Sequence, residues 1–169
     1  MTDIIADNPA ARPRIRFAKG RARRFRSGHP WAFSNEVEMT PEAKALPAGS
    51  LVTLVDAGDE ILGVATFNPH SLIAARVLSR DAADTVDVAF LAQRLGRAVA
   101  LRDELFGTPH YRLIHSEADL LPGLVVDRYG DVLSVQVNTA GMERLTPLVV
   151  EALRQVLAPR AIVLRNDSP

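Results

Sequence analysis

The stretch that most constrains the fold of this chain is Tyr111–Asp131, in which short apolar runs alternate with turn-forming residues. Leu113–Ile114 and Leu124–Val126 flank a polar loop that ends in Pro122–Gly123. A second turn leads into the alternating run Val132–Val137. Short apolar runs separated by Gly, Pro and Asp are typical of consecutive β-strands. The stretch therefore predicts three strands, and it contains no obvious reaction centre.

Helical patterns flank these three strands. Apolar residues recur at three- and four-residue spacing across Thr85–Phe106, and Gly107–Pro109 is expected to end that helix. After the strands, Thr146–Pro147 combines a capping hydroxyl with proline at the first helical position, which predicts the start of a second helix. Ala161–Leu164 then predicts a last strand. Residues 85–169 are therefore expected to form a helix-β-β-β-helix-β domain of the α+β class.

The front of the chain has short strands at regular spacing. Gly49–Leu78 contains three apolar runs separated by turn residues, and Arg14–Ala18 alternates basic and apolar side chains, as a half-buried strand does. Arg21–Arg26 is expected to form one or two helical turns. Regular short strands indicate a small barrel or sandwich, which we assign to residues 13–80. Residues 1–12 are small and polar without a period and are expected to form a flexible leader.

Composition limits the classes of protein to consider. The 169 residues are 47% hydrophobic and 24% charged, as in a globular chain with a real core. No apolar run approaches the roughly 20 residues that span a bilayer, and the N-terminus lacks the features of a secretory signal. The absence of cysteine removes thiolate nucleophiles and cysteine zinc sites, and it suits a cytoplasmic protein. We therefore expect no membrane partner and no metal.

A formal net charge of zero hides a strong asymmetry. Residues 1–35 hold eight basic and two acidic side chains, a net charge of +6, so the remaining residues carry −6. No acidic residue lies between Pro13 and Asn35. A basic segment on an acidic body suggests a polyanionic partner, most often nucleic acid, because clustered guanidiniums suit phosphate geometry. The candidate RNA-binding residues are Lys19, Arg21, Arg23, Arg24, Arg26 and His29.

The basic segment also has plainer interpretations. Its charged side chains can form a solvated helix face without any partner. Phe25 and Trp31 lie among the basic residues and can stack on bases, but both are expected in the core.

Motifs for cofactor binding and covalent catalysis are missing. None of the ten glycines lies two residues from another, so there is no G-x-G-x-x-G loop, and neither a P-loop nor a G-x-S-x-G motif occurs. His115, near Glu117 or Asp119, can be imagined as the acid–base group of a small hydrolase, although a structural role is favoured. The carboxylates of the same stretch suit turns better than a cation site, and they are Glu117, Asp119, Asp127 and Asp131.

Several long motifs resemble a known family. The front of the chain contains K-G-R-x-R-R-x-x-S-G-H-P-W-A-F-S-N-E-V, P-A-G-S-L-V-T-L-V-D, L-G-V-A-T-F-N-P-x-S and I-x-A-R-V-L. These motifs resemble the N-terminal PUA domain of the rRNA large-subunit methyltransferase I family. The later block Y-R-L-I-H-S-E-A-D-L-L-P-G-L-V-V-D-R-Y-G-D is similar to the central α+β domain of that family. The resemblance covers residues 14–167 and implies a PUA-like small β-barrel followed by a central spacer domain.

The resemblance implies an enzyme that uses S-adenosylmethionine (SAM) to make 5-methylcytosine in large-subunit rRNA. In that family a Rossmann-like domain follows the central domain and carries the cofactor loop and the catalytic cysteine. That domain is missing from this sequence. We therefore expect no catalytic, cofactor-binding or metal-binding residue in this chain, which alone is predicted to be inactive, with SAM bound by the missing domain.

Two points stay open at the level of the sequence. One is the alternative that the chain is a stand-alone PUA-type RNA-binding adaptor without catalytic activity. A reading frame that continues past Pro169 into a glycine-rich segment with a cysteine favours the enzyme, and a natural stop there favours the adaptor. The other is whether the protein forms a homodimer.

Overall fold

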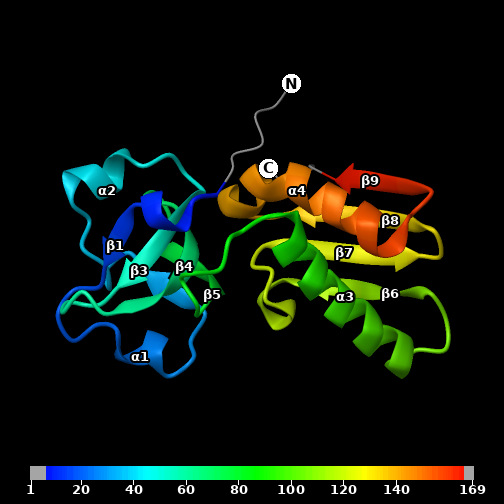
Figure 1. Cartoon of the computed structure of the whole chain (residues 1–169), viewed down its shortest axis with the longest axis horizontal. Helices are drawn as coiled ribbons and strands as arrows, with labels where there is room; N and C mark the ends of the chain where they lie inside the picture. Colours follow the sequence, from blue (N-terminus) through cyan, green and yellow to red (C-terminus); the bar gives the residue numbers. More distant parts are fainter. Residues whose placement is uncertain (1–6, 166–169) are drawn as a thin grey trace. The chain divides into compact units, whose positions relative to one another are not determined.

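The computed structural model describes residues 7–165 and has a mixed α/β fold, as the sequence predicted. The chain divides into two compact units (Figure 1), the first spanning Asp7–Thr85 and the second beginning at Val86. Among the described residues, no helix combines the length and the apolar character needed to cross a membrane.

The first unit contains a curled five-stranded sheet with the strand order β1-β3-β4-β5-β2. Its strands are β1 (Arg14–Arg16), β2 (Trp31–Phe33), β3 (Ser50–Val55), β4 (Ile61–Phe67) and β5 (Ile73–Ser79). Three short helical segments lie between and before them, namely η1 (Pro9–Ala11), α1 (Arg23–Arg26) and α2 (Pro41–Ala45). Strand β1 pairs in parallel with β3, and the other pairs are antiparallel.

The two edges of this sheet are joined by the segments that follow the edge strands. Phe17, just after β1, forms an antiparallel bridge with Val37, after β2. The amide of Ala18 donates to the Glu36 carbonyl at 2.9 Å, and the amide of Glu38 donates to the Arg16 carbonyl at 2.8 Å. The curled sheet is thereby closed into the small β structure that the sequence predicted.

The core of the first unit determines how α1 is oriented. Phe17, Phe25 and Phe67 are all buried, and the rings of Phe17 and Phe25 lie 5.2 Å apart. Because Phe25 is the buried side chain of α1, the arginines of this helix lie toward solvent. The expected inward direction of the Phe25 side chain is confirmed.

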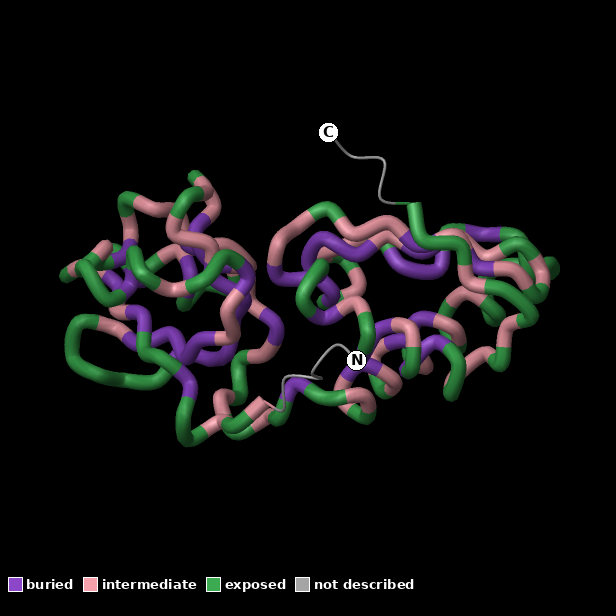
Figure 2. Tube along the Cα trace, turned by 90° about the horizontal axis from the view of Figure 1, so that it is seen from above, coloured by how far each residue is buried: buried purple, intermediate pink, exposed green. Residues whose placement is uncertain are grey.

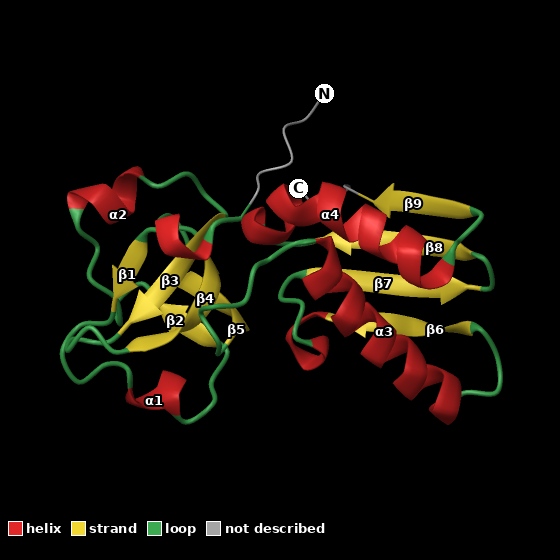
Figure 3. Cartoon of the chain, in the orientation of Figure 1, coloured by secondary structure: helices red, strands yellow, loops and turns green. Residues whose placement is uncertain are grey.

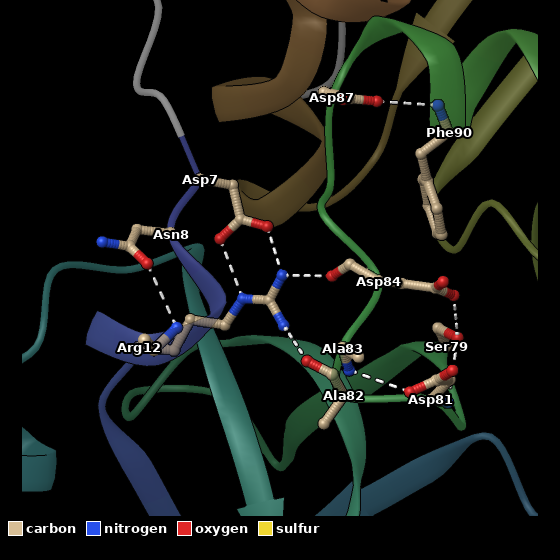
Figure 4. A network of polar contacts seen from close by, with 11 residues as sticks. Asp7, Asn8, Arg12, Ser79, Asp81, Ala82, Ala83, Asp84, Asp87 and Phe90 are labelled. Atoms are coloured by element: carbon tan, nitrogen blue, oxygen red, sulfur yellow. Dashed lines mark hydrogen bonds and ion pairs between the residues drawn. The ribbon is translucent and has the colours of Figure 1, made fainter.

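The leader predicted for residues 1–12 falls partly outside the described residues, which begin at Asp7. Asp7 to Arg12 are packed against the end of the unit (Figure 4). The Arg12 side chain donates through Nε to Asp7 Oδ1 at 2.8 Å and through Nη1 to the Ala82 carbonyl at 3.0 Å, and Nη2 contacts both Asp7 and the Asp84 carbonyl. The side chains of this ion pair are only 2% exposed. Residues 7–12 are thus anchored rather than flexible.

The second unit is a four-stranded sheet in the order β6-β7-β8-β9, with two long helices on one of its faces (Figure 3). Its elements are α3 (Val88–Leu105), β6 (His110–His115), η2 (Ser116–Asp119), β7 (Leu124–Tyr129), β8 (Val132–Val137), α4 (Ala140–Leu157) and β9 (Ala161–Arg165). The first three strands are antiparallel, and β9 returns parallel to β8. This is the predicted helix-β-β-β-helix-β order.

Burial in the second unit follows the helix–sheet packing. Buried positions, drawn in purple in Figure 2, include Leu91 and Leu95 on α3 and Leu133 and Val135 on β8. Gly123 precedes β7 with φ +81°, and an added Cβ would lie 2.3 Å from Thr139 Oγ1. A side chain is therefore excluded at this position.

The predicted start of the second helix at Thr146–Pro147 is wrong. Helix α4 begins at Ala140, where the Thr139 hydroxyl accepts the amide hydrogen of Met142 at 3.2 Å, and Pro147 lies inside the helix. The Thr146 hydroxyl instead donates to the Met142 carbonyl at 3.1 Å. The extra turns form because they bury apolar side chains ahead of the proline, those of Met142 and Leu145.

Candidate nucleic-acid interface

The candidate interface is the basic segment, which we define as residues 19–29. It runs from the turn after β1 through α1 to the turn before β2. Phe25 anchors the segment in the core. Lys19, Arg21 and Arg23 are exposed on its outer side.

Arg80, just after β5, fixes the position of this segment. Its Nη1 donates to the Phe25 carbonyl at 2.9 Å and its Nη2 to the His29 carbonyl at 2.8 Å. Its guanidinium also lies 3.9 Å from the centre of the Phe25 ring, and burial lowers the pKa of Arg80 from its ordinary value. The sequence placed Arg80 at a domain boundary and carried no signal of this role, because its partners precede it by more than fifty residues.

Two of the predicted RNA-binding arginines are held by acids from elsewhere in the unit. Arg24 Nη2 donates to Glu36 Oε2 at 2.8 Å. Arg26 Nη2 lies 2.7 Å from an Asp56 oxygen and 2.6 Å from a Glu60 oxygen. These ion pairs reduce the charge that Arg24 and Arg26 offer to a polyanion.

The partners of Arg26 belong to the turn between β3 and β4. Asp56 Oδ1 accepts the amide hydrogens of Gly58 at 2.8 Å and Glu60 at 2.9 Å, and these backbone hydrogen bonds lower the Asp56 pKa. The Glu60 pKa is lowered chiefly by the hydrogen bond from Arg26. Both carboxylates therefore stay ionised at neutral pH and keep their hold on the arginine.

The remaining cations of the basic segment have a different environment. Lys19, Arg21 and Arg23 are exposed, and none of them forms an ion pair with any residue in the described part of the chain. Their charge is not neutralised by a nearby carboxylate. These three side chains are therefore the ones best able to meet phosphates.

His29 is held in place beside the strand that follows it. The amide of Trp31 donates to His29 Nδ1 at 3.2 Å, and His29 Nε2 lies 3.3 Å from Arg24 Nη1. The imidazole ring also packs edge-on against Trp31, with the ring centres 5.5 Å apart. The structure thus brings His29 next to Arg24 and Trp31, although the sequence grouped it only with the basic residues.

The expectation that both interleaved aromatic residues lie in the core holds only for Phe25. Phe25 is 1% exposed, whereas Trp31 and Phe33 on β2 are half-buried. The Arg24 guanidinium lies 4.4 Å from the Phe33 ring centre and that of Arg76 lies 5.3 Å from the Trp31 ring centre. Sequence reasoning missed Phe33 and Arg76, and the spacing W-A-F on a short strand was the only signal for Phe33.

The carboxylates of the second unit are engaged in structural contacts. Asp119 pairs with Arg102 at 2.7 Å and accepts the backbone amide hydrogen of His115, so it does not orient the imidazole. Asp127 pairs with Arg112, Asp131 with Arg160, and Glu117 accepts the Ser116 hydroxyl. No cluster of three or more metal-ligating side chains occurs within residues 7–165. Asp119, one of the two carboxylates considered as a partner of His115, is therefore occupied by Arg102 and the His115 backbone amide.

SAM is the cofactor that the resemblance implies. Nucleoside cofactors are bound where a strand leads through a glycine-rich loop into an exposed helix N-terminus. The crossover from β8 into α4 is the parallel unit of this sheet, but Thr139 already caps the Met142 amide there. Gly123 packs directly against Thr139. The described residues of this crossover therefore lack the open, glycine-rich helix start at which a nucleoside cofactor is bound.

Known proteins resemble this chain over both units. Residues 15–80 match the PUA-like domain family. The chain is 40% identical over 157 residues to ribosomal RNA large subunit methyltransferase I of Cronobacter sakazakii, and 37% identical to the proteins of the same name from Shewanella frigidimarina and Escherichia coli O139:H28. Each match covers 91% of this chain and 39% of the relative.

Two solved structures share the fold. A candidate SAM-dependent methyltransferase from Streptococcus mutans superposes with a TM-score of 0.75 at 16% identity, over 93% of this chain and 44% of that protein. A candidate methyltransferase in complex with SAH gives the same TM-score at 17% identity, over 90% of this chain and 40% of the other. At this level of identity the likeness concerns the fold. The chain spans about two fifths of the length of its curated relatives.

Proposed function

We propose that this chain, a homologue of the ribosomal RNA large subunit methyltransferases I, is the RNA-binding part of a SAM-dependent rRNA methyltransferase. It would position large-subunit rRNA for methylation at C5 of a cytosine. The names of the relatives and the match to the PUA-like family support RNA as the class of substrate. The observation that carries the proposal is the row of exposed cations without an acidic partner among the described residues, Lys19, Arg21 and Arg23.

These cations would act on the phosphate backbone. Each phosphate neutralised by a lysine or arginine releases condensed counterions, so affinity falls as salt rises. Arg24 and Arg26 would contribute less, because Glu36, Asp56 and Glu60 already compensate their charges. Their role is to hold the basic segment on its scaffold, together with Arg80.

The second unit would act as a spacer. One face of its sheet is covered by α3 and α4, whose buried side chains make it a compact block on which further residues of a complete enzyme would be placed (Figure 3). SAM would supply the methyl group when bound by residues outside this chain, and those residues would also provide the catalytic cysteine. This chain alone would then bind RNA without methylating it.

RNA binding is tested by measuring fluorescence anisotropy of a labelled large-subunit rRNA hairpin at several salt concentrations. We expect a linear fall of log affinity with log salt. Replacing Arg23 with Gln should reduce the magnitude of that slope by roughly 0.7–0.9, the value for one lost phosphate contact. The matched variant Arg26→Gln should change the slope much less, because that guanidinium is already paired.

Two results would contradict this proposal. Affinity that does not depend on salt would exclude phosphate binding by the basic segment. Equal effects of Arg23→Gln and Arg26→Gln would show that the ion pairs do not decide which cations are available. Far-ultraviolet circular dichroism of each variant confirms that it is folded.

Cofactor binding is tested by calorimetry of the chain with SAM. We expect no heat of binding, because the crossover from β8 into α4 has no glycine-rich loop and is capped by its own Thr139. Binding in the micromolar range would place a cofactor site inside this chain.

A further inference from the structure

Strand β2 displays an unusual arrangement of aromatic side chains. Residues at alternate positions of a strand lie on the same face, so Trp31 and Phe33 share one side while Ala32 is buried on the other. Both aromatic residues are only half-buried. The core of the unit is filled by other phenylalanines, Phe17, Phe25 and Phe67.

The position of β2 leaves this aromatic pair at the rim of the sheet. Strand β2 is an edge strand whose sheet partner is β5, and Trp31 lies opposite Arg76 in that pairing. The rings of Trp31 and Phe33 meet edge-on, with centres 6.4 Å apart. The two side chains therefore form one continuous aromatic surface.

Two guanidiniums and an imidazole border the same surface. The guanidiniums of Arg24 and Arg76 lie over Phe33 and Trp31 respectively, at 4.4 and 5.3 Å from the ring centres. His29 packs against Trp31. Glu36 also reaches this surface, and its Oε2 accepts hydrogen bonds from Arg24 at 2.8 Å and from the Phe33 amide at 2.9 Å. A flat aromatic ring is the ligand that complements such a surface, and the exposed cations of the basic segment are available for an attached anion.

We propose that Trp31 and Phe33 form a stacking surface for an unpaired nucleobase of the bound RNA. The inference rests on the proposed function and adds a second mode of contact to it. Arginine and aromatic side chains together bind single-stranded nucleic acid, because the base stacks on the ring while the cation meets the phosphate. A base inside a duplex is already stacked on its neighbours and cannot present its face.

The link to the basic segment is structural. Arg24 belongs to α1 and reaches both Glu36 and Phe33, and the turn that contains His29 joins α1 directly to β2. A strand of RNA whose phosphates meet Arg21 and Arg23 would thus find the aromatic surface on the next element of the chain. The basic segment would supply affinity and the aromatic surface would select unpaired nucleotides.

Trp31 provides its own probe, because it is the only tryptophan in the protein. The full chain is titrated with two RNAs that have the same number of phosphates, one an unpaired oligonucleotide and the other a blunt duplex. Stacking of a base on the indole should quench Trp31 fluorescence with the unpaired RNA. The duplex should bind through the basic segment and leave the fluorescence nearly unchanged.

Variants separate stacking from charge. Trp31→Ala should weaken binding of the unpaired RNA by roughly 5- to 150-fold, the range for one lost stacking contact, while the salt slope stays the same. Trp31→Phe should retain most of the affinity. The matched control is Leu72→Ala, which removes a neighbouring side chain that is 71% exposed but has no aromatic face, and it should bind as the wild type does.

The outcomes distinguish this inference from the function on which it rests. Salt-dependent binding of both RNAs with no quenching overturns the stacking surface and leaves RNA binding intact. No binding of either RNA overturns the proposed function itself. If Trp31→Ala fails to fold, the quenching of the wild type and the affinity of Trp31→Phe decide. Equal quenching by the duplex also contradicts the proposal, since a paired base cannot stack there.

Discussion

Two arginines of the first unit, eleven residues apart in the sequence, serve opposite purposes. The Arg12 side chain is buried and bound to Asp7 and to two backbone carbonyls (Figure 4). Arg23 is exposed and has no ion pair with the described residues. Burial of a guanidinium is tolerated only when its donors are satisfied, so Arg12 is structural and Arg23 is free to meet a ligand.

Replacing Arg12 with Ala should destabilise the first unit by about 3–5 kcal/mol, the range for breaking a buried ion pair. The substitution removes the guanidinium from a carboxylate that is only 2% exposed and takes a donor from the Ala82 carbonyl. Urea unfolding followed by Trp31 fluorescence measures the change. Arg14→Ala, an exposed arginine two residues later, is the control and should stay within about 0.5 kcal/mol of the wild type. Equal effects of both variants would show that the buried pair contributes no special stability.

Sequence reasoning identified the basic segment but not which of its cations are available. The run from Pro13 to Asn35 contains no acid, and that observation is correct. The acids that neutralise Arg24 and Arg26 lie 12 to 34 residues farther along the chain and reach them only after folding. Tertiary ion pairs of this kind leave no local pattern in the sequence.

At the scale of an element, helix α4 also shows that tertiary packing can outweigh a local sequence signal. Thr139 and Thr146 are both suitable capping residues, and Pro147 makes the second one the stronger local signal. The helix nevertheless starts at Ala140, because two further buried side chains outweigh the missing backbone hydrogen bond at the proline. The strands were easier to predict, since β4 begins and ends at the residues where its apolar run does.

Replacing Pro147 with Ala should stabilise the second unit by about 1–3 kcal/mol. Proline has no amide hydrogen for the Glu143 carbonyl, and its ring crowds the preceding turn, whereas alanine restores the hydrogen bond. Pro147 is exposed, so the change leaves no cavity in the core. Thermal unfolding followed by circular dichroism at 222 nm measures the effect on helix content and stability. A lower melting temperature would mean that the proline fits a bend on which packing of α4 depends.

The turn between β3 and β4 should make the stability of the first unit depend on acid. The Asp56 pKa is lowered by the amide hydrogen bonds from Glu60 and Gly58, so folding favours the ionised carboxylate. This contribution is complete above the ordinary value of 3.8 and is lost as the pH falls through the lowered pKa. Asp56→Asn should unfold at a lower urea concentration than the wild type at neutral pH, and the unfolding midpoints of the two proteins should converge as the pH falls. Midpoints that differ by the same amount down to pH 2 would exclude Asp56 as the group responsible.

At the scale of the whole molecule, the neutral total charge conceals how the charges are used. Folding pairs part of the positive N-terminal region with acids of the same unit and leaves the tip of the basic segment unpaired among the described residues. The sequence predicted the small β structure of the first unit and the helix-β-β-β-helix-β order of the second. It could do so because the turns and apolar runs that indicate these elements are local patterns. The aromatic surface on β2 could not be predicted, because the half-burial of Trp31 depends on which phenylalanines fill the core.

The hydrogen bonds of the Arg12 side chain also have a consequence for biosynthesis. Its carbonyl partners, Ala82 and Asp84, follow it by 70 and 72 residues, and β1 needs β3 as its neighbour in the sheet. Contacts this distant in sequence form slowly, and they cannot form before both ends have been made. We therefore expect the first unit to remain open during translation until Asp84 has left the exit tunnel. Until then, the arginines of the nascent chain stay beside the ribosome without their acidic partners.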